Sequence, residues 1–254
     1  MAPWSGAFTI DWVADGRLPF AQIDARRFVL DDKATIRYEG CTGLEGALDE
    51  DTIERIREVD ATRLPATDLA SIPPMLRWFA NTYGLHTPAA LIHDWLIDDD
   101  PRSKPFITNE QADRYFRFML GAVGVPFFKR WIMWSAVALA TRFRTGGVRM
   151  YLVVLWALLA TAGIVAFGWA ALGIAFDVGL PWDVNPGLAL LLSLAAPWIA
   201  SSLWGRQYGA GVVGSMAAPW ILPPTAFASV GFLIYRILER GVAPVERFVK
   251  RVRS

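Results

Sequence analysis

An uncharged apolar run constrains this chain more than any other feature of its sequence. From Tyr151 to Phe176 no residue carries a charge, and Gly163, Gly168 and Gly173 are spread along the run. A helix of about 20 apolar residues is long enough to cross the hydrocarbon core of a bilayer. Glycines are common where membrane helices pack closely, within one chain or between copies. The run therefore predicts a transmembrane helix, and its glycines predict helix contacts either within the chain or between the copies of a homo-oligomer.

Two further apolar stretches follow. Residues 187–204 are barely long enough for a second span, and aromatic residues lie at its ends as they do at membrane interfaces. Residues 212–238 are interrupted by Pro219, Pro223 and Pro224, which remove backbone donors and disfavour helix in the preceding residues. This third stretch is expected to form either a re-entrant hairpin bent at the prolines or a kinked third span.

The charges that flank these stretches predict an orientation. Arg142, Arg144 and Arg149 precede the first span and Arg206 follows the second, whereas the loop between the spans has aspartates and no cation. Lysine and arginine near span ends collect on the cytoplasmic side, so the N-terminal domain is expected in the cytoplasm. The tail, residues 239–254, is also basic and has an amphipathic pattern. It is expected on the same side, either lying on an anionic membrane surface or acting as a charged flank.

The first half of the chain reads as a soluble domain. Hydrophobic residues make up 54% of the whole chain, above the roughly 45 to 50% of soluble proteins, and the excess lies in the second half. Short strands are expected within 8–13 and 26–40, and a short helix or a strand within 48–60. The lone Cys41 excludes an internal disulfide and is compatible with a reducing compartment. The N-terminus has no basic segment followed by an apolar one, so no cleaved signal peptide is expected.

Helix-start signals mark the rest of this domain. Thr87 is expected to cap a helix that has Pro88 at its first position, Thr108 and Gln111 form a capping box, and Pro126 opens a core or interfacial helix. The predicted fold class is an α+β soluble domain (1–148), with short N-terminal strands followed by a small helical bundle. It is joined to an α-helical transmembrane domain (149–238) and the basic tail (239–254).

Polar residues near the middle of the chain form the candidate site. On the helix from Thr87 the apolar side chains share one face, whereas His93 and Asp94 project to the other side and are expected away from the core. Asp68 and Ser71 lie in a proline-terminated turn before this helix, and Asp113 lies on the next helix. Imidazole and carboxylates together are a common ligand set for a divalent metal that activates water.

The same residues carry a resemblance. "TDLASIPP", "TPAALIHDWL" and "QADRYFRFMLGAVGVPFFKRWIMWSAVAL" resemble the domain of unknown function 1353 family of bacteriophages, prophages and bacteria. The similarity covers roughly residues 62–141. The family's pattern is matched by Thr67, Asp68, Ala70, Ser71 and Pro73, by His93 and Asp94, and by Ala112 and Asp113. The chain has Ile97 where a tyrosine usually follows the doublet, and His86 falls outside the pattern. The resemblance implies that these polar residues form one site, and it implies no activity.

Two functions from different classes remain open. The first is a membrane-anchored, metal-dependent hydrolase. In it His93, Asp94 and Ser71 are catalytic, and Asp68, His93, Asp94 and Asp113 bind Mg²⁺, Mn²⁺ or Zn²⁺. A serine triad is also open, although Ser71 lacks the glycine-flanked elbow of hydrolases.

The second function is a non-catalytic envelope module, in which His93, Asp94 and Asp113 form a buried hydrogen-bonded network. Such a module assembles in the bilayer or binds a partner through its transmembrane helices. Nucleic-acid binding is disfavoured because the basic residues gather at membrane flanks. Nucleotide-binding glycine loops do not occur in the sequence.

Overall fold

The computed structural model describes residues 8–11, 18–23, 27–39, 48–64, 66–67, 76–81, 83–97, 107–176 and 185–253. The chain divides into two compact units. The first is made of Met1–Ser71 and Thr82–Met216, and the second of Ile72–Asn81 and Ala217–Ser254. In the second unit the indole Nε1 of Trp78 donates to the hydroxyl of Thr225 at 3.4 Å.

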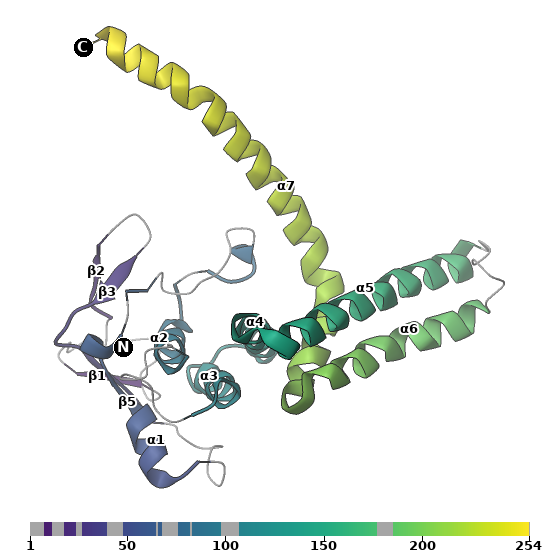
Figure 1. Cartoon of the computed structure of the whole chain (residues 1–254), viewed down its shortest axis with the longest axis horizontal. Coiled ribbons are helices and arrows are strands. Elements are labelled where there is room, and N and C mark those ends of the chain that lie inside the picture. Colours follow the sequence, from purple (N-terminus) through teal and green to yellow (C-terminus); the bar gives the residue numbers. More distant parts are fainter. Residues whose placement is uncertain are drawn as a thin grey trace. The chain divides into compact units, whose positions relative to one another are not determined.

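Two small antiparallel sheets open the first unit (Figure 1). Their strands are β1 (Phe8–Asp11), β4 (Thr35–Tyr38) and β5 (Glu58–Asp60) in the order β1-β4-β5, and β2 (Phe20–Gln22) paired with β3 (Phe28–Leu30). A tight turn joins β3 to β4, in which the Ala34 amide donates to the Asp31 carbonyl at 2.9 Å. The strands predicted within 8–13 and 26–40 are confirmed, whereas β2 was not predicted.

Four helices make up the rest of this part of the unit. They are α1 (Glu50–Arg57), α2 (Thr87–Leu96), α3 (Asn109–Ala122) and α4 (Phe127–Thr145), with a short 3₁₀ turn, η1 (Ala61–Arg63), after β5. The helices α3 and α4 begin at the expected start signals. The capping box of Thr108 and Gln111 is present at the start of α3. Thr87 is the first residue of α2 and not its cap, because its hydroxyl accepts from the Gly84 amide at 2.8 Å and closes the preceding turn.

The core of this part joins the larger sheet to the helices. Tyr38 of β4 packs edge to face on Tyr115 of α3, with ring centroids 5.4 Å apart. Trp95 and Leu96 of α2 are buried in the same cluster. In Figure 1, α2, α3 and α4 are seen nearly end on as a row, and α4 is the member that contacts α5. The sheet therefore supports α2 and α3 on one side, and α4 faces the apolar half of the chain.

The two apolar stretches form an antiparallel hairpin of α5 (Gly147–Phe176) and α6 (Pro186–Ser201) (Figure 1). The buried residues of α5 recur at intervals of three, four or seven and make one stripe: Val153, Trp156, Ala160, Gly163, Ala170 and Gly173. A Cβ added at Gly163 would lie 2.9 Å from the Cβ of Ala196, so the glycine lets the helices approach closely. Gly168 lies on the exposed side with open space around it.

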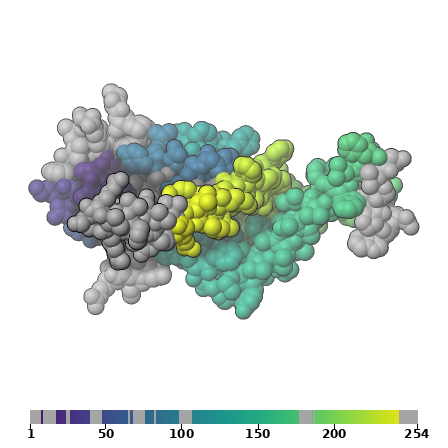
Figure 2. Space-filling view, turned by 90° about the horizontal axis from the view of Figure 1, so that it is seen from above, coloured from purple at the N-terminus to yellow at the C-terminus, as the bar shows by residue number. Residues whose placement is uncertain are grey.

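The remaining surface of the hairpin is apolar and exposed, and Figure 2 shows α5, in teal, uncovered along much of the face that is seen. Its exposed large side chains are Val148, Tyr151, Val154, Leu155, Leu158, Leu159, Val165, Phe167, Trp169, Leu172, Ile174 and Phe176 on α5, with Leu188, Leu191, Leu192, Leu194, Trp198 and Ile199 on α6. By length and composition two helical stretches are able to cross a membrane, Gly147–Phe176 and Gly187–Gly241.

The third apolar stretch lies within a single helix. After the short turn η4 (Ser202–Gln207), α7 runs from Tyr208 to Arg253 without a break at Pro219, Pro223 or Pro224. The re-entrant hairpin predicted for residues 212–238 is therefore wrong. A proline removes one donor and bends a helix, but the helix continues when the remaining backbone bonds hold it together.

We expect the α5–α6 seam to be intolerant of a larger side chain at Gly163. Gly163→Val should lower the free energy of unfolding in detergent by about 1–3 kcal/mol, because the new methyl groups meet Ala196. Gly168→Val is the matched control on the open side of the same helix. Equal unfolding midpoints for the two variants would contradict the close packing of the hairpin.

Candidate functional site

The candidate site centres on Asp113 of α3, whose side chain is fully buried. Its Oδ1 accepts from Nε2 of His93 at 2.9 Å and from Oγ1 of Thr141 at 2.9 Å. Its Oδ2 accepts from Nε2 of Gln207 at 2.8 Å. An ionised carboxylate has no proton to give, so Nε2 of His93 carries the proton of the first bond. Both oxygens of the buried carboxylate are thus engaged by donors from three other elements.

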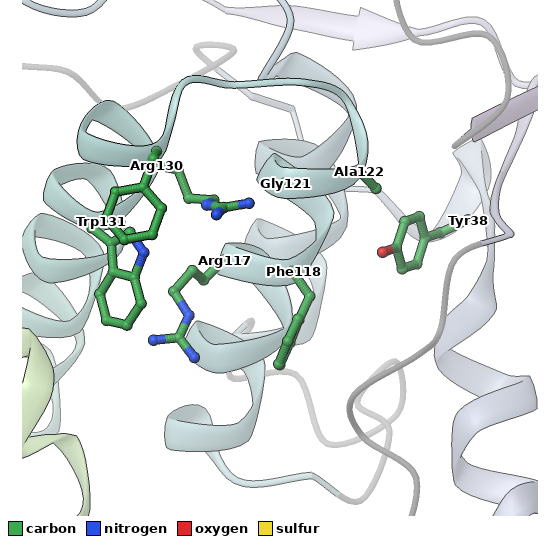
Figure 3. A pocket seen from close by; sticks show the side chains of 8 residues that line it. Tyr38, Arg117, Phe118, Gly121, Ala122, Arg130 and Trp131 are labelled. Atoms are coloured by element: carbon green, nitrogen blue, oxygen red, sulfur yellow. The ribbon is translucent and has the colours of Figure 1, made fainter.

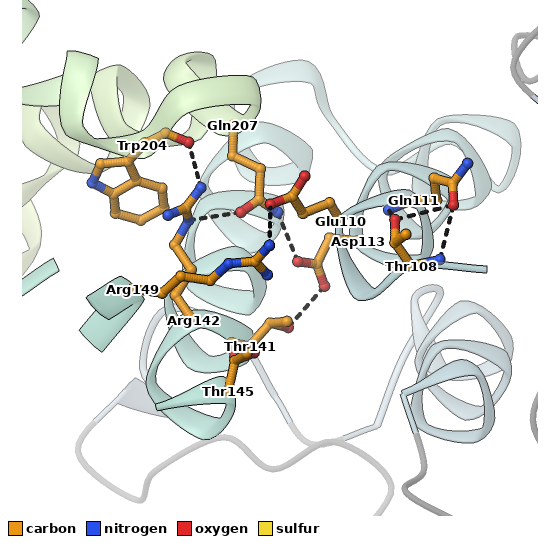
Figure 4. Close-up of polar contacts among 10 residues, drawn as sticks. All are labelled: Thr108, Glu110, Gln111, Asp113, Thr141, Arg142, Thr145, Arg149, Trp204 and Gln207. Atoms are coloured by element: carbon orange, nitrogen blue, oxygen red, sulfur yellow. Dashed lines mark hydrogen bonds and ion pairs between the residues drawn. The ribbon is translucent and has the colours of Figure 1, made fainter. Parts of the chain in front are cut away.

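The network continues into the base of the hairpin (Figure 4). Arg142, the residue after Thr141 on α4, donates from Nε to Oε1 of Gln207 at 2.8 Å and from its terminal nitrogen to the carbonyl of Trp204. Its guanidinium also lies 5.2 Å from the centroid of the Trp204 ring. Burial lowers the pKa of Arg142, and the negative charges of Glu110 and Asp113 oppose that shift. Arg142 and Asp113 therefore bring opposite charges to the two ends of the Gln207 amide.

His93 lies where the helical pattern did not place it. Its exposed fraction is 4%, so the expectation that it projects away from the core is wrong. Every residue of α2 except Asp94 is buried, because α3 covers the face opposite the sheet. The His93 ring packs against Phe116 of α3 at 5.1 Å between centroids, and its Nε2 bonds Asp113 from there. His93 is thus a buried polar residue between two helices.

Asp94 faces a different neighbour. It is half-buried, and its Oδ2 accepts from Oγ1 of Thr67 at 3.4 Å. The Thr67 backbone pairs with Phe28, which fixes it beside the smaller sheet. The fold therefore brings the first residue of the "TDLASIPP" turn next to the His-Asp doublet. Asp68 and Ser71, which follow in that turn, lie outside the described residues.

The arrangement of the described histidines and carboxylates bears on the predicted metal site. Within the described part of the chain, no three histidine, cysteine, aspartate or glutamate residues gather closely enough to hold a metal ion. His93 and Asp113 are adjacent, but their contact is a hydrogen bond that uses the proton on Nε2. A metal on Asp113 would compete with the three donors that already bond its two oxygens. The described residues alone do not supply the predicted ligand set.

Three residues of the network were not predicted: Thr141, Arg142 and Gln207. Their signal in the sequence is weak, since each is a polar residue at the edge of an apolar stretch. An antiparallel hairpin brings the residues before its first helix close to those after its second. A search for polar partners across that base would have paired Arg142 with Gln207.

Comparison with known families assigns part of the chain. Residues 48–137 match the family described as Protein of unknown function (DUF1353). The resemblance predicted from the motifs is confirmed, and the match begins before the 62–141 range first expected. It contains His93, Asp94 and Asp113, whereas Thr141, Arg142 and Gln207 lie beyond it. No curated protein and no solved structure matches the chain. The network therefore ties the DUF1353 segment, residues 48–137, to the part of the chain outside the family match.

Asp113→Asn should destabilise the protein. The new amide group turns at least one accepting position into a donor, and each buried donor left without an acceptor costs about 1–3 kcal/mol. We expect a clear drop in the unfolding midpoint measured in detergent.

Glu110→Gln is the control, because Glu110 lies one turn earlier on α3 and makes only a partly exposed ion pair with Arg149 at 3.4 Å. Loss of this ion pair should lower the free energy of unfolding by about 0–1 kcal/mol. An Asp113→Asn protein that unfolds like the parent but has lost a metal bound by the parent would assign Asp113 to a metal site instead.

Proposed function

We propose that the chain is a membrane-anchored protein in which α5 and α6 cross the bilayer and the DUF1353 segment lies at its surface. The observation that carries this proposal is the apolar, uncharged and exposed outer face of the hairpin. Large side chains such as Leu158, Phe176 and Leu191 are more than three-fifths exposed. A helix that is apolar on all sides is at home in a hydrocarbon solvent, whereas in water such a surface promotes association.

The proposal includes an orientation. Arg142, Arg144 and Arg149 lie at the start of the hairpin and Arg206 at its end, so these cations share one side of the membrane. By the positive-inside rule that side is the cytoplasm, and the DUF1353 segment lies there too. By the same rule the basic tail, residues 239–254, also lies on the cytoplasmic side. Because α7 is unbroken, a tail on the cytoplasmic side means that α7 lies along the surface instead of crossing.

Within this arrangement we assign the Asp113 network a docking role. Its donors come from α2, α4 and η4, so the hydrogen bonds hold the helices of the DUF1353 segment against the base of the hairpin. A buried carboxylate with both oxygens hydrogen-bonded favours a fixed position over turnover. The chain is then a non-catalytic membrane module that presents its soluble face to a partner. The exposed apolar face of α5 supports assembly of several copies.

A hydrolase is the second candidate, and one observation favours it. The contact between Thr67 and Asp94 places the start of the turn that contains Asp68 and Ser71 beside the His-Asp doublet. A site made of Asp68 and Asp94 would bind Mg²⁺ or Mn²⁺ through carboxylates. Metal analysis of the purified full chain beside an Asp68→Ala, Asp94→Ala variant tests it. Equal metal content in the two proteins excludes this site.

Cysteine labelling tests the anchor and its orientation. In a Cys41→Ser background, Phe167→Cys and Leu191→Cys should react with a membrane-impermeant maleimide only after detergent is added. Glu54→Cys on exposed α1 is the control, and it should react in inside-out vesicles but not in intact cells. Ser254→Cys should behave like Glu54→Cys.

Labelling of the hairpin cysteines in intact vesicles would contradict membrane insertion. A Ser254→Cys protein that reacts only from outside would contradict the surface position of α7.

A further inference from the structure

A pocket of about 330 Å³ lies between α3 and α4, away from the Asp113 network. Figure 3 shows Arg117 of α3 and Arg130 and Trp131 of α4 between the two helices, and Phe118 and Tyr38 also line the pocket. None of the residues that line this pocket is acidic. The cavity therefore combines two cations with aromatic walls and has no built-in anion.

Arg117 packs against two tryptophans of α4. Its guanidinium carbon lies 4.2 Å from the Trp131 ring centroid and 4.3 Å from that of Trp134. The two indole planes are inclined by 83°, so they contact the cation from two directions. Such contacts stabilise a cation without using its N–H donors in hydrogen bonds. In the part of the chain that the structure describes, no hydrogen bond or ion pair engages the N–H donors of Arg117.

Arg130 approaches from the opposite side and depends on a glycine. A Cβ at Gly121 would lie 2.3 Å from a terminal nitrogen of Arg130, so the guanidinium occupies the space that a side chain would fill. Among the described residues Arg130 has no carboxylate partner. Burial lowers the pKa of Arg117, and the positive charges of Arg114 and Arg130 lower it further. A bound anion would relieve this repulsion between cations.

The pocket opens beside an aromatic helix end. Phe127 and Phe128 begin α4 and are 58% and 79% exposed. In Figure 1, α4 is seen nearly end on whereas α5 and α6 lie in the plane of the picture, so α4 runs across the base of the hairpin. If the hairpin crosses the bilayer, α4 lies along its surface, where aromatic side chains reach lipid and arginines meet phosphates.

We propose that the Arg117–Arg130 pocket binds the phosphate of a phospholipid headgroup, with Phe127 and Phe128 in contact with the acyl region. This site rests on the proposed membrane anchor. Two guanidinium groups that line one pocket without an acidic neighbour are suited to a phosphate, which accepts bidentate, charge-assisted hydrogen bonds. A free phosphate shares that chemistry but gains nothing from the exposed phenylalanines.

Calorimetric titration of the full chain in mild non-ionic detergent tests the site. The probes are dihexanoyl phosphatidylglycerol below its micelle concentration and sodium phosphate. We expect the lipid to bind, and Arg130→Gln and Arg117→Gln each to weaken it about tenfold or more, as loss of a charge-assisted contact does. Gly121→Ala should also weaken it, because it displaces Arg130 without removing a charge. Arg144→Gln, an exposed arginine of the same helix, should leave the affinity unchanged.

Three outcomes overturn the proposal: no binding of the lipid by the parent, equally tight binding of sodium phosphate, or an equal loss in Arg144→Gln. The unfolding midpoint of each variant shows whether it is folded. If Arg117→Gln does not fold, the affinities of Arg130→Gln and Gly121→Ala test the site in its place. The titration needs no bilayer, whereas the cysteine labelling needs no lipid ligand. Failure of one therefore leaves the other result intact.

Discussion

The arrangement of the first unit depends on one buried carboxylate. Asp113 is removed from water, and an isolated charge in that position would be very costly. Three donors from three elements offset the cost, and Arg142 polarises one of them through the Gln207 amide. Because the bonds have to be made together, they fix α2, α3, α4 and η4 in one geometry. Apolar packing alone would allow the same helices to slide.

The α5–α6 hairpin is held together by other interactions than the helices around Asp113. In the α5–α6 seam small residues let two backbones approach, and no charged residue takes part from Tyr151 to Phe176. Around Asp113 the contacts are polar and directional. Trp156 of α5 contacts both kinds of surroundings. Its indole packs on Trp204, with 4.8 Å between ring centroids, and donates a hydrogen bond to Ser215 at 3.0 Å. The polar network thus ends where the apolar seam begins.

The sequence predicts elements well and contacts poorly. Local signals such as the Thr108 capping box and the uncharged run to Phe176 place α3 and α5, because helix starts and apolar length are set by nearby residues. The burial of His93 could not be predicted from α2 alone, since α3 supplies the second covering face. Gln207 joins a site 94 residues away in the chain, and no spacing rule links them. The helix α7 continues through its three prolines, because the backbone hydrogen bonds on either side hold the helix together.

The position of Gln207 gives the chain an order of assembly during synthesis. Asp113 is made 94 residues before the amide that completes its hydrogen bonds. At about 5–20 residues per second, that interval is on the order of 5 to 20 s. Through this time α3 carries a carboxylate without its last donor, while both helices of the hairpin emerge. The DUF1353 segment therefore reaches its final form only after the hairpin has been made, so the apolar half of the chain acts as the last folding partner of the polar half.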